Sequence, residues 1–140
     1  MTGGTFDLLH YGHVLHLDAC EELAGQRAGV FVMLITDRWG EERKGKNRPV
    51  LGYEERKAIL VGLRINPENI IPVDRIDDLA ACVESIRPDS YVYELETNRE
   101  AHEKALAVCG KLGIKTVDMG KKPTNPFGTS TSTIIERIRG

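Results

Sequence analysis

One stretch near the start of the chain, residues 4–13, constrains the fold more than any other. It reads Gly-Thr-Phe-Asp-Leu-Leu-His-Tyr-Gly-His, a glycine-bearing turn that leads into two histidines spaced three residues apart. Glycine lets backbone N–H groups approach an anion closely, and a helix that begins near Tyr11 would add its positive N-terminal dipole. Residues i and i+3 share a helix face, so His10 and His13 could both donate to one phosphate group. The sequence therefore predicts a phosphate-binding turn followed by a helix.

Downstream, apolar runs of strand length alternate with segments of helical periodicity. The apolar runs predict strands over residues 29–36, 69–73, 90–93 and 114–119. Apolar residues at helical spacing predict helices over residues 11–23, 53–64, 76–86, 98–112 and 130–138. The residues before the glycine turn provide only a stub, so the first strand is either very short or partly missing. The polar, glycine-punctuated residues 37–52 are expected to form a loop.

This alternation predicts an α/β fold. With 140 residues the chain fits a single domain over residues 1–140. We expect a Rossmann-like three-layer arrangement, a parallel sheet of about five strands with helices on both faces. In such sheets the ligand lies beyond the carboxyl ends of the strands. The glycine turn and the segments that begin at Asp37, Glu94 and Lys121 should therefore gather at one edge.

Four cations are concentrated in the predicted loop, within Arg43-Lys44-Gly45-Lys46-Asn47-Arg48. In an extended segment alternate residues point the same way, so Lys44, Lys46 and Arg48 would face one side. That arrangement suits the charge of a triphosphate. A solvated, charged surface loop is the alternative, which the neighbouring Glu41 and Glu42 favour.

The second strong pattern is a cluster of hydroxyl side chains before the last predicted helix. Gly128 is followed by Thr-Ser-Thr-Ser-Thr and then by an apolar pair. One serine would be an ordinary N-cap, but so many hydroxyls in a row exceed what capping needs. At a helix N-terminus, hydroxyl and backbone donors together bind phosphate, which makes Ser130, Thr131 and Ser132 candidate ligands.

These motifs resemble those of the cytidylyltransferase-like nucleotidyltransferases. The first family motif, Gly-x-Phe-Asp-x-x-His-x-Gly-His, is matched at Gly4, Phe6, Asp7, His10, Gly12 and His13. Its wording is most similar to that of the glycerol-3-phosphate cytidylyltransferases. The basic segment, the Arg-Pro at 48–49 with Glu-Arg at 55–56, and the hydroxyl cluster resemble further family motifs, in the same order.

The resemblance implies a reaction in which an acceptor phosphate, or less often a hydroxyl, attacks the α-phosphorus of a nucleoside triphosphate and releases pyrophosphate. It implies that His10 and His13 donate to the α-phosphate and that Lys44 and Lys46 contact phosphates. The remaining implied nucleotide-binding residues are Gly4, Thr5, Phe6 and Gly12 in the turn, and Ser130, Thr131 and Ser132 at the β- and γ-phosphates.

Three further residues are expected on the acceptor side. Asp7 is either a structural carboxylate of the turn or a group that orients the ligand. Asp37 follows a strand and could face the acceptor, and Arg56 would hold either the acceptor phosphate or the loop. Mg²⁺ is the expected cofactor, carried mainly by the nucleotide phosphates rather than by a protein metal site. The resemblance also implies a homodimer.

The sequence departs from the family pattern in two places. Asn125-Pro126-Phe127 stands where these cytidylyltransferases carry Arg-Thr-x, and Tyr93-Glu94-Leu95-Glu96 replaces a Gly-Asp-Asp or Lys-Gly segment that lies near the base. Lys121 or Lys122 could supply the missing charge. The leading hypothesis is transfer from CTP to a small phosphorylated acceptor such as a polyol phosphate. Transfer from ATP to a sugar phosphate or FMN is the first alternative, and a non-catalytic nucleotide-binding module is the second.

Composition excludes several other classes. The net charge of −2 argues against a general nucleic-acid binder, and no apolar run approaches bilayer-spanning length. Three widely spaced cysteines without a C-x-x-C pair are expected to be free thiols in a reducing cytoplasm. His16 and His102 belong to no motif and are expected at the surface. Trp39 is expected to pack beneath the loop, with stacking on a ligand as the alternative.

Overall fold

A strand of only three residues, β1 (Thr2–Gly4), lies at the centre of the sheet. The computed structural model describes residues 1–121 and 125–140, and within them five parallel strands follow the order β3-β2-β1-β4-β5. The other strands are β2 (Val32–Ile35), β3 (Ile70–Val73), β4 (Ser90–Tyr93) and β5 (Lys115–Asp118). The α/β fold with a parallel sheet is therefore confirmed.

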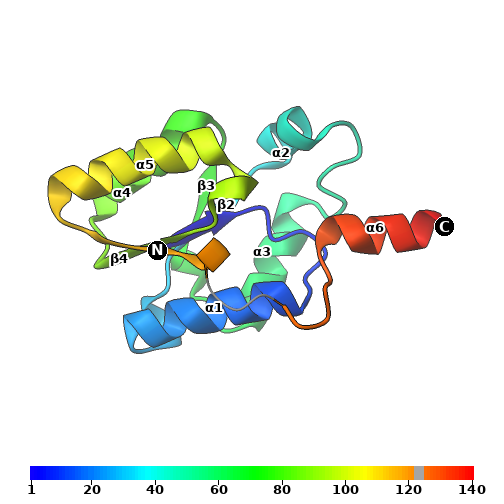
Figure 1. Ribbon diagram of the computed structural model, residues 1–140, viewed down its shortest axis with the longest axis horizontal. Coiled ribbons are helices and arrows are strands. Elements are labelled where there is room, and N and C mark those ends of the chain that lie inside the picture. The colour runs from blue at the N-terminus through cyan, green and yellow to red at the C-terminus, as the bar shows by residue number, and fades with distance from the viewer. Residues whose placement is uncertain (122–124) are drawn as a thin grey trace.

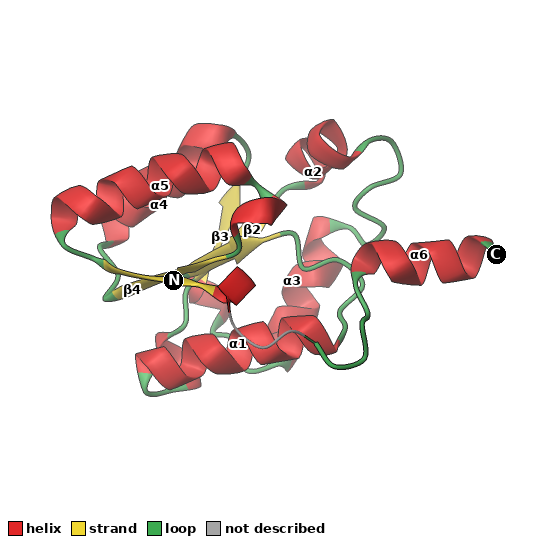
Figure 2. Cartoon of the chain, viewed as in Figure 1, coloured by secondary structure: helices red, strands yellow, loops and turns green. Residues whose placement is uncertain are grey.

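Helices cover both faces of this sheet (Figures 1 and 2). The described α-helices are α1 (Tyr11–Ala24), α2 (Asp37–Lys44), α3 (Tyr53–Gly62), α4 (Ile76–Ile86), α5 (Arg99–Leu112) and α6 (Thr131–Arg139). Single 3₁₀ turns lie at Arg27–Gly29, Pro67–Asn69, Leu95–Thr97 and Met119–Lys121. On one face α4 and α5 pack against the sheet, and on the other face α1 and α3 do so.

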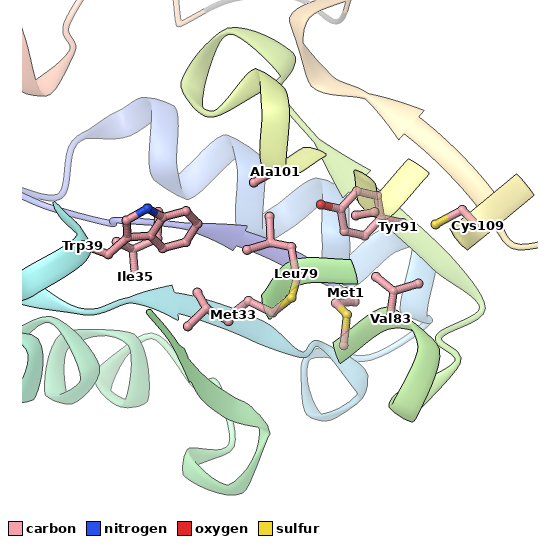
Figure 3. Packing of buried hydrophobic residues seen from close by; sticks show 11 residues of the cluster. Met1, Met33, Ile35, Trp39, Leu79, Val83, Tyr91, Ala101 and Cys109 are labelled. Atoms are coloured by element: carbon pink, nitrogen blue, oxygen red, sulfur yellow. The ribbon is translucent and has the colours of Figure 1, made fainter. Parts of the chain in front are cut away.

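Alternation along the strands divides the core into two layers. In β2, Met33 and Ile35 belong to the cluster under α4 and α5, whereas Val32 and Leu34 belong to the cluster under α1 and α3. Figure 3 shows the first cluster, in which the side chains from β2 and β4 meet those of the helices. All four β2 side chains are buried, which is the pattern of a parallel strand covered on both faces.

The prediction of a loop over residues 37–52 is wrong in its first half, because α2 occupies Asp37–Lys44. The Thr36 hydroxyl caps this helix by accepting from the Trp39 amide. Trp39 is 3% exposed and packs into the core cluster of Figure 3, as expected of a packing residue. Gly40 allows a close approach, since a Cβ there would lie 2.8 Å from Cδ of Pro49. Buried contacts of Trp39 and Gly40 therefore stabilise this helix, although most of its residues are charged.

Helix α6 differs from the other helices. No residue of it is buried, and Figure 1 shows it projecting from the body of the molecule toward the C-terminus. None of the helices within residues 1–121 and 125–140 is long and apolar enough to cross a membrane.

Candidate active site

A cavity of about 590 Å³ opens at the carboxyl edge of the sheet, within the size range of small-molecule sites. Its walls come from the segments that follow β1, β2, β4 and β5, and from the residues that lead into α6. The gathering of the glycine turn with the segments after Asp37 and Glu94 is therefore confirmed. After β5, Met119 and Gly120 line the cavity, while the side chain of Lys121 and all of Lys122 lie outside the described residues.

The N-terminus of α1 positions the two motif histidines. His10 is the N-cap, and its Nδ1 accepts from the Gly12 amide at 3.1 Å. His13 reaches back, so that its Nδ1 accepts from the His10 amide at 3.2 Å. The two ring centroids are 4.0 Å apart, and both residues line the cavity. Because Nδ1 is an acceptor in each ring, the proton of each neutral ring is on Nε2.

Both histidines are held neutral by their surroundings. Burial, together with the nearby His10 and His16, lowers the pKa of His13 to about 3. Burial also lowers the pKa of His10 below its ordinary value. With the proton on Nε2, each neutral ring can donate to the oxygens of an anion in the cavity that both residues line.

The turn before α1 is shaped by residues with left-handed backbone. Phe6 and Leu8 have φ values of 50° and 44°, which L side chains adopt rarely. The Phe6 ring is 5% exposed and lies 5.4 Å from the His13 ring, so core packing holds it in place. Gly12 carries no Cβ for a clear reason, since one would lie 2.8 Å from Cε1 of His10. The turn residues Gly4, Thr5 and Phe6 all line the cavity.

The hydroxyl cluster meets the first motif at the cavity. Ser130 is the N-cap of α6, and its side chain and that of Thr133 exchange capping hydrogen bonds with each other's amides. The Thr131 hydroxyl donates to the Asp7 carbonyl oxygen at 2.8 Å, across 124 positions of sequence. Ser130, Thr131 and Ser132 line the cavity, as does Asn125, whose amide donates to the Thr129 hydroxyl at 2.7 Å. The structure thus brings the two predicted phosphate-binding motifs together.

The three residues expected on the acceptor side form structural contacts. The Asp7 carboxylate accepts from the amides of Val50 and Leu51 at 2.7 and 2.9 Å, which matches the structural alternative. Arg56 is fully buried and donates to three backbone carbonyls, those of Thr5, Ile35 and Leu51. Its guanidinium also donates to Asp37 Oδ1 at 2.7 Å, so one carboxylate oxygen of Asp37 is held by Arg56. Of the three, Asp7 alone borders the cavity in the part of the chain that the structure describes.

The basic segment departs from the predicted extended conformation. Lys44 ends α2, and the Arg48 amide donates to the Gly45 carbonyl at 3.2 Å, which closes a turn. Lys44 and Arg48 line the cavity, whereas Lys46 is exposed at the turn and lies outside the described lining. Burial, followed by the charges of Arg43 and Arg48, lowers the pKa of Lys44. Like charges therefore crowd this wall of the cavity.

The expectation that His16 and His102 lie at the surface is wrong. His102 is 1% exposed, and its Nδ1 lies 2.7 Å from the Tyr91 hydroxyl in the core. Its Nε2 faces the Thr97 hydroxyl at 3.5 Å, and burial lowers its pKa to about 4. His102 thereby supports the turn after β4, where Glu94 and Thr97 line the cavity.

His16 is partly buried and, like His102, lies within hydrogen-bond distance of a hydroxyl group. Its Nε2 lies 2.6 Å from the Thr2 hydroxyl, which itself donates to the Val92 carbonyl. Burial lowers its pKa to about 4. Its spacing of three from His13 on α1 was a signal in the sequence, since it places His16 on the same helix face.

Among the described residues, carboxylates are not gathered as they would be around a resident cation. In residues 1–121 and 125–140, no three His, Cys, Asp or Glu side chains form a cluster suited to a metal ion. Asp7, the carboxylate of the first turn, already accepts two backbone hydrogen bonds. The described cavity lining combines imidazole, hydroxyl and cationic groups with two carboxylates, those of Asp7 and Glu94. This set is compatible with a cation that arrives on phosphate oxygens.

Comparison with known proteins identifies the family to which these motifs belong. The cytidylyltransferase-like family model matches residues 1–137. FAD synthase of Methanobrevibacter smithii is 29% identical over 99% of this chain and 89% of its own length, and that of Methanobrevibacter ruminantium is 31% identical over 99% and 90%. The bifunctional protein HldE of Nitrosococcus oceani is 34% identical over 99% of this chain, which spans only 27% of that protein.

A solved structure shares the fold. The lipopolysaccharide core biosynthesis protein of Thermoplasma volcanium has a TM-score of 0.55 and 22% identity, covering 84% of this chain and 92% of that one. At this identity the likeness concerns the fold alone. The match of the family model over residues 1–137 shows that this chain belongs to the cytidylyltransferase-like family of nucleotidyltransferases.

Proposed function

We propose that this chain transfers a nucleoside monophosphate from a nucleoside triphosphate to a small phosphorylated acceptor. An acceptor phosphate oxygen attacks the α-phosphorus, the bond from that phosphorus to the bridging oxygen breaks, and pyrophosphate leaves with the bond's electrons. The observation that carries the proposal is the pair of neutral Nε2–H donors of His10 and His13, set beside the hydroxyl cluster in one cavity.

Such a transfer needs no protein nucleophile, because positioning and charge stabilisation suffice. His10 and His13 would donate to the α-phosphate oxygens as negative charge develops on them. The backbone of Gly4, Thr5 and Phe6 would face the phosphates next to Gly12, and Ser130, Thr131 and Ser132 would hold the β- and γ-phosphates. Lys44 would contribute a positive charge, and Asp7, Asp37 and Arg56 would hold the walls in place. Mg²⁺ bound to the phosphate oxygens would offset negative charge on the nucleotide.

The identity of the nucleotide is the finer part of the proposal. Relatives named FAD synthase, matched over nearly their whole length, favour ATP as donor and FMN as acceptor. The wording of the first motif favours CTP and a polyol phosphate instead. Asn125, which stands in place of the cytidylyltransferase arginine, supports the adenylyl form, and we place that form first.

The test is pyrophosphate release with ATP or CTP, Mg²⁺ and a panel containing FMN, sugar phosphates and polyol phosphates. Release with ATP and FMN, with FAD as the second product, is the expected result. Release with CTP alone would assign the chain to cytidylyl transfer. Nucleotide binding without release from any pair would favour the non-catalytic module and contradict the proposed activity.

Two further parts of the proposal concern the molecule's setting. We propose a homodimer, supported by the large apolar side chains that α6 and its neighbourhood expose, among them Phe127 at 68% and Ile138 at 76%. Light scattering on a size-exclusion column tests this directly.

We also propose a cytoplasmic site of action, which suits the free thiols of Cys20, Cys82 and Cys109.

A further inference from the structure

Arg48 is a charged residue of the cavity wall. The sequence groups it with Lys44 and Lys46, but the family resemblance implies phosphate contacts for the two lysines and assigns none to Arg48. Its side chain is 22% exposed and lines the cavity, at the end of the turn that begins with Gly45. Its Nε atom is buried and has no hydrogen-bond partner within the described residues. A buried guanidinium donor without an acceptor is costly, so such a group commonly has a partner in the functional state.

The carboxylate beside Arg48 does not meet that need. Asp7 Oδ2 forms an ion pair with Nε of Arg48 at 3.9 Å, a separation beyond hydrogen-bond distance. Both oxygens of Asp7 are instead engaged by the amides of Val50 and Leu51 at 2.7 and 2.9 Å. Asp7 therefore fixes the backbone that follows Arg48 and orients the guanidinium without satisfying it.

Excess positive charge on this wall indicates what would satisfy it. Arg43, Lys44 and Arg48 all line the cavity. Burial lowers the pKa of the Lys44 ammonium, and the charges of Arg43 and Arg48 lower it further. Arg43 donates a hydrogen bond to the Thr97 carbonyl. A carbonyl oxygen carries no full negative charge, so this contact does not neutralise the charge of Arg43. A polyphosphate chain, with several negative charges and many acceptor oxygens, matches three clustered cations better than a single phosphate does.

Lys46 provides the contrast. It is two residues away and carries the same charge, but it is exposed at the turn and lies outside the described cavity lining. We propose that Arg48, and not Lys46, is the residue of the basic segment after α2 that binds the polyphosphate chain of the nucleoside triphosphate. The inference rests on the proposed function for the identity of the ligand.

The experiment is a titration of the full chain with inorganic tripolyphosphate, and separately with ATP and CTP, by isothermal calorimetry. Arg48→Gln removes the charge while keeping much of the side-chain length, and Lys46→Gln is the matched control. We expect Arg48→Gln to raise the Kd for tripolyphosphate about tenfold or more, as loss of a charge-assisted hydrogen bond does. Lys46→Gln should stay within about twofold, as expected for an exposed charge.

A second measurement uses the unmodified chain and does not depend on a variant that folds. Phenylglyoxal modifies accessible arginines, and peptide mass spectrometry reports which ones. Tripolyphosphate should slow modification of Arg48 while leaving that of the exposed Arg64 unchanged.

Unchanged binding in a folded Arg48→Gln variant, an equal loss in Lys46→Gln, or no protection of Arg48 would each overturn the inference. The proposed function fails differently, by showing no pyrophosphate release from any substrate pair. Arg48-dependent tripolyphosphate binding together with no release would uphold the inference and reject the transfer reaction.

Discussion

The first turn, residues 4–13, and the segment from α2 to α3, residues 43–56, border the same cavity but are shaped by different kinds of contact. In the first turn, the hydrogen bonds that place His10 and His13 join residues two or three positions apart. In the second segment they span far more of the chain, from Asp7 to Val50 across 43 positions and from Arg56 to Thr5 across 51. A motif can therefore encode the first geometry, whereas the second exists only once the sheet has formed.

The largest expected effect follows from replacing Arg56, whose hydrogen bonds hold the segment of residues 43–56 in place. Arg56→Met should lower the free energy of unfolding by about 3 to 5 kcal/mol, because it leaves buried carbonyls and Asp37 without their donor. Urea denaturation measures the loss. Arg64→Met is the matched control, since Arg64 is exposed and lies 3.8 Å from Glu21, and it should cost less than about 1 kcal/mol. Equal costs for the two variants would contradict the assigned role of Arg56.

His10 tests the first region by separating its cap from its donor. Asparagine is a good N-cap and can accept from the Gly12 amide, but it cannot place a donor where Nε2–H lies. His10→Asn should therefore keep the melting temperature while kcat in the pyrophosphate assay falls about 10²- to 10³-fold, as for loss of a donor to a developing charge. A variant with both properties unchanged would show that the ring serves only as a cap.

His102 sharpens the comparison through pH, because its pKa is lowered to about 4 in the folded protein from an ordinary value of 6.5. The unfolded chain takes up a proton that the buried ring resists, so stability is full above pH 6.5 and declines as pH falls toward 4. Between pH 7 and 5 the ring should account for about 2 kcal/mol of lost stability. Urea denaturation of the wild type and His102→Gln at both pH values measures this share. A variant with the same pH dependence as the wild type would contradict it.

Gly12 gives the smallest expected effect. In Gly12→Ala the new Cβ would lie 2.8 Å from Cε1 of His10, so the ring must shift and kcat should fall about tenfold. Gly110→Ala on α5 is the control, since no atom lies within 4 Å of the added Cβ. That change should raise stability by about 0.5 to 1 kcal/mol through helix propensity, without altering kcat. An unchanged kcat in Gly12→Ala would mean that the ring position matters little.

The same distinction explains how far the sequence could be interpreted. Apolar runs predicted β2 to β5, and apolar periodicity predicted five of the described α-helices, because burial on both sheet faces requires apolar side chains at these positions. The three residues of β1 were expected only as a stub. Apolar periodicity missed α2, whose helix depends on one buried tryptophan and on the contact of Gly40 with Pro49. Polar composition alone could not reveal these tertiary contacts.

For the candidate site, the motif residues of the first turn and the hydroxyl cluster were placed at the cavity by local pattern together with topology. The burial of His102 could not be predicted, because its partner Tyr91 lies on a strand and no local spacing links the two. Alternation placed Lys46 on the same side as Lys44 and Arg48. That prediction assumed an extended segment, but a hydrogen-bonded turn from Gly45 to Arg48 is present instead. A hydrogen bond to a neighbouring strand decided the position of His102, and a local turn decided that of Lys46.

The hydrogen bond from Thr131 to the Asp7 carbonyl has a consequence for how the molecule assembles. It joins the start of an otherwise unburied helix to the first turn, so one wall of the cavity is completed by residues 124 positions from the opposite wall. A ligand that touches both walls binds only the fully folded chain, and mass action then converts its affinity into added stability of α6. The bound nucleotide would in that case hold α6, which buries no residue in the protein core, against the first turn.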